Sequence, residues 1–155
     1  MKNDEILVKL ANRTIEYFRN DLILPAESSY EIVEVEKIDY LDITTLITLS
    51  DDMTGTVGFS VSNDLALNMV ENFIYGNVSP KEMIELASEN VAETLNIALG
   101  NILKELTIIK KGGSVNISTP YTLQNSVSLT KKRDGLMYLC KLKSNNEVML
   151  LSYFA

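Results

Sequence analysis

Apolar residues recur at spacings of three and four positions in two separate segments of the chain. This period is typical of amphipathic helices, so we predict helices at residues 4–21 and 63–75. Ser62 precedes the second helix and is a good N-cap residue, and Gly76 can end it in the left-handed conformation. The stripes that we expect to be buried are Ile6, Leu7, Leu10, Ala11, Thr14, Ile15 and Phe18 in the first helix and Leu65, Ala66, Met69, Val70, Phe73 and Ile74 in the second.

A third and longer helix is predicted from Ser79 to about residue 108. Its start combines three favourable signals: Ser79 can cap the helix, Pro80 suits the first helical position, and Glu82 completes a capping box. One apolar stripe runs along the whole segment, which favours burial of a single face. The stripe consists of Ile84, Ala87, Val91, Leu95, Ala98, Ile102 and Leu106.

The rest of the chain is rich in β-branched residues, in alternating patterns and in turn signals, which indicate strands. Asp134-Gly135 and Ser144-Asn145-Asn146 are typical hairpin turns. Because helices and strands are segregated rather than strictly alternating, we predict an α+β fold with a largely antiparallel sheet, in a single domain over residues 1–155. The predicted strands are 29–38, 42–50, 54–61, 114–118, 126–132, 136–143 and 147–154.

Charge and composition narrow the possible functions. A formal net charge of −7 argues against binding to nucleic acid or to an anionic membrane surface. The absence of histidine from the 155 residues removes Ser-His-Asp and Cys-His catalysis and most zinc sites. The one cysteine, Cys140, lies in an apolar strand pattern and is expected to be a buried thiol. With no apolar stretch long enough to span a bilayer and no signal peptide, we expect a cytoplasmic protein.

Four positions of the long helix do not fit its apolar stripe. Glu89, Glu93, Asn96 and Gly100 follow one another at spacings of four, three and four, so they fall on one face. A carboxylate there can pair with an incoming lysine, and a carboxamide can hold and orient a water molecule. Glycine inside a helix is unfavourable by about 1 kcal/mol relative to alanine. Either close packing of neighbouring helices or an open docking surface beside Asn96 would explain Gly100.

Residues 93–101, with the sequence ETLNIALGN, resemble the signature helix of the CheX/CheC family of chemotaxis phosphatases. That signature is Glu-x-x-Asn followed after three residues by Gly-Asn, and Glu93, Asn96, Gly100 and Asn101 match it. The chain is more similar to CheX than to CheC, because CheC-like chains carry two such helices and this chain has one motif.

The resemblance extends over most of residues 53–123. The strand at 55–61, followed by an apolar helix ending at Tyr75-Gly76, is similar to the strand-helix unit of the family. Residues 117–120, with the sequence ISTP, resemble its strand leading to a proline. The implied architecture is a largely antiparallel sheet packed with the long signature helix and two further helices.

The resemblance also implies an activity and site residues. Family members remove the phosphoryl group from the aspartate of a response-regulator receiver domain. Glu93 would pair with the lysine of the receiver and Asn96 would align the attacking water, while Glu89, Gly100 and Asn101 would belong to the docking face. The resemblance implies no cofactor or metal bound by this chain, Mg²⁺ supplied by the receiver, and a homodimer.

Two other functions are compatible with the same residues. The chain could be a non-catalytic binding module for a receiver domain or for a flagellar-switch or signalling partner, with Asn96 as a contact. It could also be a structural domain in which Glu93 and Asn96 are ordinary solvated residues. The exposure of Glu93 and Asn96 distinguishes the docking functions from a purely structural one, because burial of both side chains against the core of the domain would exclude docking.

Overall fold

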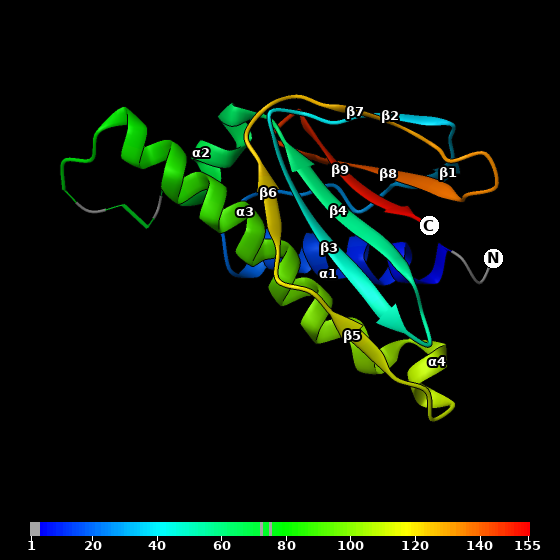
Figure 1. The fold of residues 1–155 in the computed structure, drawn as a ribbon. Coiled ribbons are helices and arrows are strands. Elements are labelled where there is room, and N and C mark those ends of the chain that lie inside the picture. Colours follow the sequence, from blue (N-terminus) through cyan, green and yellow to red (C-terminus); the bar gives the residue numbers. More distant parts are fainter. Residues whose placement is uncertain (1–3, 72, 75) are drawn as a thin grey trace.

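Helices and antiparallel strands make up the fold, as predicted (Figure 1). The computed structural model describes residues 4–71, 73–74 and 76–155. The helices are α1 (Glu5–Asn20), α2 (Asn63–Glu71), α3 (Pro80–Ile102) and the short α4 (Thr107–Lys110), with a 3-10 turn at Leu103–Glu105. The strands are β1 (Glu31–Glu34), β2 (Lys37–Asp39), β3 (Ile43–Asp51), β4 (Gly55–Val61), β5 (Val115–Ile117), β6 (Tyr121–Leu123), β7 (Ser128–Thr130), β8 (Met137–Ser144) and β9 (Glu147–Phe154).

Two long hairpins form the centre of a seven-stranded sheet with the order β1-β8-β9-β4-β3-β5, in which β6 also pairs with β3. The predicted hairpin of β3 with β4 is confirmed, with Ile43 opposite Val61. The predicted turn between β8 and β9 is confirmed as well. Asn145 and Asn146 have φ angles of 50° and 66°, and asparagine tolerates this left-handed region better than most residues.

Both faces of the sheet are covered, as the alternation of β8 illustrates. Tyr138 and Cys140 belong to the main hydrophobic cluster with α1 and α3, while Met137 and Leu139 belong to a second cluster on the other face. The second cluster lies against the two-stranded sheet of β2 and β7, which contributes Ile38. Because successive side chains of a strand point to opposite faces, burial of both sets requires a layer on each side.

Cys140 is fully buried, as the sequence predicts. Burial raises the pKa of its thiol to about 12, because the apolar surroundings disfavour the thiolate. The thiolate is the reactive form of cysteine, so this residue acts as a small apolar side chain.

α3 is shorter than predicted. Its start is confirmed: the backbone N–H of Glu82 donates to Ser79 Oγ at 3.2 Å, and that hydroxyl donates to Glu82 Oε1 at 3.0 Å. The predicted end near residue 108 is wrong, because the helix ends at Ile102 and Leu106 is extended. Leu106 is nevertheless buried, so the break lets the chain turn and still place this side chain in the core.

A contact between distant segments holds the chain after this break. The backbone N–H and the Oγ1 of Thr107 both donate to the carboxylate of Glu5 in α1, at 2.9 and 2.8 Å. Glu5 therefore satisfies one of the free N–H groups at the start of α4. A contact across 102 residues leaves no periodic signal in the sequence, which is why the break was not predicted.

α2 follows the sequence prediction only in part. The N–H of Leu65 donates to Ser62 Oγ at 3.1 Å, which confirms the cap. The helix ends at Glu71 rather than at residue 75, and the predicted end residue Tyr75 lies outside the described residues. Gly76 has the expected positive φ of 85°. Phe73 was predicted to be buried and is 54% exposed, because the helix ends before it.

The strand prediction needs three corrections. The predicted strand at 29–38 is two strands, of which β1 pairs with β8 and β2 pairs with β7. Asp134-Gly135 is therefore a turn but joins no hairpin, because β7 leaves the main sheet. β6, at Tyr121–Leu123, was not predicted. Which strands pair is decided by contacts between distant segments, and a strand of three residues is too short for a periodic signal.

We expect Ser79→Ala to lower the free energy of unfolding by about 1 kcal/mol, because the N-cap acceptor is lost. Urea denaturation followed by circular dichroism measures this change, and the m-value should stay constant. Ser79→Thr is the matched control, because its hydroxyl keeps both the acceptor for Glu82 N and the donor to Glu82 Oε1. Equal losses in both variants would show that the cap does not stabilise α3.

Candidate functional site

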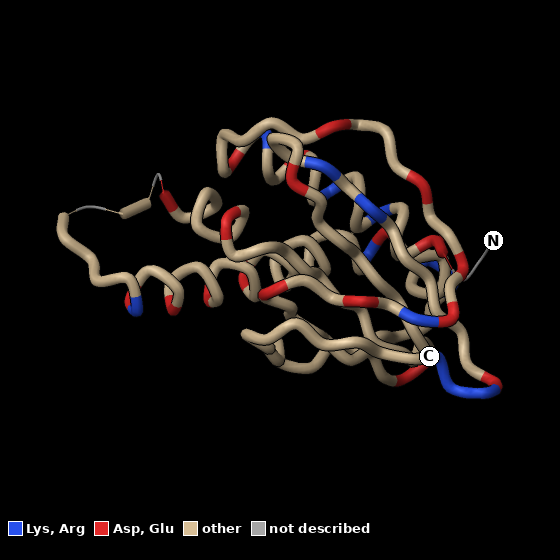
Figure 2. The backbone as a smooth tube through the Cα atoms, turned by 90° about the horizontal axis from the view of Figure 1, so that it is seen from above, with Lys and Arg blue, Asp and Glu red and all other residues tan. Residues whose placement is uncertain are grey.

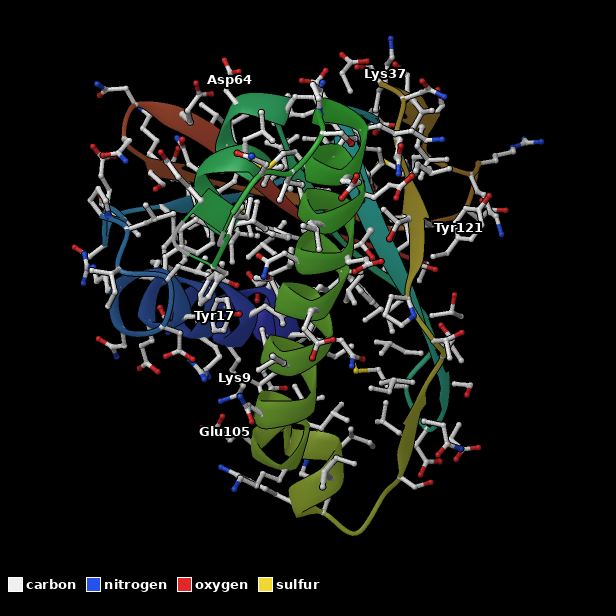
Figure 3. The ribbon with its side chains drawn as sticks, turned by 90° about the vertical axis from the view of Figure 1, so that its left-hand side faces the viewer. Lys9, Tyr17, Lys37, Asp64, Glu105 and Tyr121 are labelled. Carbon is white, nitrogen blue, oxygen red and sulfur yellow. The ribbon has the colours of Figure 1, made fainter. Side chains whose placement is uncertain are left out.

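The outer face of α3 carries the polar residues that the sequence analysis predicted to share one side of the helix. α3 contacts β3, β4 and β6 through its buried side and α2 and α1 along its flank. Glu89, Glu93 and Gly100 are exposed and Asn96 is partly exposed, on the side opposite the buried stripe. In Figure 3, α3 crosses the front of the molecule, with α2 and part of α1 on one side and β6 and β5 on the other. The expected shared face is confirmed, and it is open to solvent.

The polar groups of three side chains on this face have no hydrogen-bond or ion-pair partner within the described residues. Within the described part of the chain, neither Glu89 nor Glu93 forms an ion pair, and the Asn96 carboxamide forms no hydrogen bond. A carboxylate without a partner can accept a lysine from another molecule. A free carboxamide can offer both a donor and an acceptor to water. Exposure leaves docking possible, whereas burial of both side chains would have excluded it.

Gly100 lies beside open space. A Cβ atom built on this residue has no neighbour within 4 Å, apart from its own helical turn. Tight packing of neighbouring helices, one of the two explanations for this glycine, is therefore wrong. The other explanation remains: the missing side chain leaves a smooth surface one turn after Asn96, where another molecule can approach the helix backbone.

Asn101 is exposed but does not share this face. At 3.6 residues per turn, it is rotated by about 100° from Gly100 around the helix axis. The sequence motif therefore maps onto two sides of the helix. Glu93, Asn96 and Gly100 form one surface, and Asn101 lies beside it at the end of α3.

Tyr17 of α1 lies close to this site and was missed by the sequence analysis. It is buried between α1 and α3, below α2 in Figure 3. The pKa of its hydroxyl is raised, mainly by burial. A hydrogen bond with Thr94 and the charge of Arg13 oppose this rise, and the negative charges of Asp21 and Glu93 add to it. The signal was present, because Tyr17 lies three positions after Thr14, a member of the predicted stripe. Its hydroxyl supports the helix directly beside Glu93.

The described residues contain no group of three or more histidine, cysteine, aspartate or glutamate side chains that could hold a metal ion. Residues 4–71, 73–74 and 76–155 also include no helix long and apolar enough to cross a membrane.

Comparison with known proteins gives both a family and a fold. A family model described as "Chemotaxis phosphatase CheX" matches residues 43–141, a range that contains all of α3. Chemotaxis protein CheX from Desulfovibrio desulfuricans is 12% identical with a TM-score of 0.73, over 96% of this chain and 97% of that chain. Chemotaxis protein CheX from Vibrio vulnificus is 15% identical with a TM-score of 0.72, over 97% of each chain.

A further similar structure is a CheX-CheY-BeF3-Mg complex from Borrelia burgdorferi. It is 15% identical to this chain with a TM-score of 0.66, and 96% of each chain is covered. No curated protein sequence is a significant match. At such low identity the solved structures establish the fold, and the family follows from the match over residues 43–141.

We expect Gly100→Ala to raise the free energy of unfolding by about 0.5–1 kcal/mol, because alanine is the better helix former and its methyl group meets no neighbour. Gly58→Ala is the contrasting control, because its Cβ would lie 2.5 Å from Ser152 Oγ and 2.9 Å from Leu46 Cδ2. Thermal and urea unfolding measure the change in stability of each variant, and we expect the two changes to have opposite signs. Destabilisation by Gly100→Ala would mean that the space beside this residue is filled.

Proposed function

The chain belongs to the CheX family of chemotaxis phosphatases, and we propose that it hydrolyses the phosphoryl-aspartate of a CheY-type receiver domain. The observation that carries this proposal is the open face of α3, where Glu93 and Asn96 have no partner among the described residues. The fold shared with the CheX-CheY complex of Borrelia burgdorferi supports the choice of partner.

Glu93 fixes the docking in this proposal. Its exposed carboxylate forms an ion pair with the active-site lysine of the receiver. Four glutamates and one lysine lie along α3, so this side of the molecule attracts a partner that presents positive charge (Figure 2). The overall charge of −7 agrees with a protein partner of this kind.

Asn96 positions the water. It lies one turn after Glu93 on the same face, so docking through Glu93 brings the Asn96 carboxamide to the phosphoryl group. Its Oδ1 accepts a hydrogen bond from the water and orients the water oxygen in line with the bond to be broken. A carboxamide does not take up the proton, because it is neutral and hardly basic. Asn96 therefore acts by alignment.

The reaction is a hydrolysis. The water oxygen forms a bond to phosphorus while the bond between phosphorus and the aspartyl oxygen breaks. The aspartate leaves as a carboxylate, and both protons of the water end on the released phosphate. Mg²⁺ bound to the receiver neutralises charge on the phosphoryl oxygens, so this chain needs to supply only positioning and exclusion of bulk water.

The Tyr17–Thr94 contact supports the alignment. Thr94 lies between Glu93 and Asn96 in sequence and faces the core, where it meets Tyr17 and donates a hydrogen bond to the backbone oxygen of Asn90. These buried contacts restrain the turn of α3 that carries both site residues. A rigid turn matters because displacement of an aligned group by about 1 Å can reduce a rate about 10²-fold.

Two other parts of the proposal follow from the family resemblance. We propose that the protein forms a homodimer and that it acts in the cytoplasm, where response regulators are found. Neither part is needed for the chemistry of a single site.

We expect Asn96→Ala to lower the rate of dephosphorylation about 10²-fold or more with little change in affinity, because it removes alignment in the transition state. Glu93→Ala should raise KM about tenfold, because it removes one partner of a charge pair. The assay follows loss of phosphate from a phosphorylated receiver in Mg²⁺. Glu34→Ala in β1 is the matched control, because it removes the same charge from a remote exposed position.

A receiver that binds to the wild-type protein but keeps its normal dephosphorylation rate would contradict the enzymatic proposal. The same result, with binding sensitive to Glu93→Ala, would establish a non-catalytic binding module.

The Gly100→Ala variant separates docking from stability. Its methyl group fits the folded chain but stands on the docking face, so we expect KM to rise several-fold while the melting temperature rises as well. Opposite signs in these two measurements indicate a contact with a partner. Unchanged KM and kcat would place the interface away from this turn of α3.

A further inference from the structure

An apolar groove lies beside the site, between the end of α2 and the first half of α3. Phe73 and Ile74 line it from the α2 side, and Leu86, Asn90, Glu89 and Glu93 line it from α3, around a cavity of about 320 Å³. Phe73 is 54% exposed and Leu86 is 42% exposed. Two large exposed apolar side chains in one groove are typical of an interaction surface.

The groove also contains an unsatisfied polar atom. Asn90 Oδ1 is buried and has no hydrogen-bond partner within the described part of the chain. A buried acceptor without a donor is unfavourable, so such atoms in folded proteins are normally paired. With an exposed area below 1 Å², this atom is out of reach of a donor from another molecule in this arrangement of the side chains.

The groove is continuous with the catalytic face. Glu89 and Glu93 line the groove and also belong to the outer face of α3. None of the described residues that line it is basic, whereas these two carboxylates form its rim. The charge and the apolar floor together suit a partner segment with an apolar side chain next to basic ones.

We propose that this groove is a second docking contact for the same receiver domain, which would place an apolar side chain against Phe73 and Leu86 while its lysine meets Glu93. This inference rests on the proposed function. Continuity with Glu93 favours the receiver over any separate partner, because a molecule that docks on Glu93 covers the rim of the groove.

The groove serves affinity and selectivity rather than chemistry. Asn96 does not line it, so the contacts made in the groove would be the same before and during the reaction. Contacts of that kind change KM and leave kcat unaltered. Receivers that present a polar or acidic side chain at this position would be poor substrates even with the same active-site residues.

The test compares Phe73→Ala, Leu86→Ala and the double variant with wild type. Binding to a receiver domain activated with BeF3 and Mg²⁺ is measured by calorimetry, and turnover of the phosphorylated receiver is measured in parallel. We expect Kd and KM to rise roughly ten- to hundredfold in the double variant, from the loss of two buried apolar contacts, with kcat unchanged at saturation. Val33→Ala in β1 is the matched control, because Val33 is 43% exposed.

The outcomes separate the two proposals. One outcome is that the double variant binds the receiver with a normal Kd, while Asn96→Ala abolishes turnover. This result would overturn the proposed docking contact in the groove and support the proposed phosphatase activity. Weakened binding without turnover by wild type supports the groove and overturns the phosphatase. No binding to any receiver of the same genome overturns both. A change in sedimentation of the free protein, with normal receiver binding, would assign the groove to contacts between copies and overturn this inference.

Discussion

The packing of α3 against β3 and β4 is the constraint on which the rest of the site depends. Removal of its apolar side from water stabilises the helix and determines which residues face outward. The buried side consists of Ala87, Ser88, Val91, Thr94, Leu95, Ala98, Leu99 and Ile102. The opposite side must then face solvent, and that is where Glu93 and Asn96 lie. A rotation of the helix by one residue would bury one of them and expose Leu95 or Val91.

Contacts outside the outer face keep α3 in place. Ser79 defines where the helix starts, and the contact of Glu5 with Thr107 holds the chain just beyond its end. Tyr17 supports the middle through Thr94. These three contacts come from α1, from the turn before α3 and from α4, so the outer face is held by the whole domain rather than by its own side chains. In the proposed function, a surface that is held in this way would align a water molecule on another protein.

In the proposed mechanism this chain supplies positioning and the receiver supplies charge neutralisation, which agrees with the composition of the chain. A chain without histidine and with one buried cysteine has few groups for covalent or acid-base catalysis at neutral pH. Phosphoryl transfer to water depends mainly on geometry and on charge neutralisation, and the receiver would supply the charge. This chain would then need to supply only a carboxylate for docking, a carboxamide to align the water and an open turn at Gly100 for close approach. The neighbouring groove at Phe73 and Leu86 would add selectivity among receivers that share the same active-site chemistry.

Local signals determined much of this protein. Helical period, the Ser79 cap and the asparagine turn predicted α3, its outer face and the central hairpins, because each signal lies within a few residues. The α+β class followed from the order of the elements, and the family resemblance came from a nine-residue run in α3. Only the tertiary structure decided the remaining features. The pairing of β2 with β7, the break after Ile102, the exposure of Phe73 and the position of Tyr17 beside Glu93 all depend on contacts between distant segments, and no local pattern records which distant segment a residue will meet.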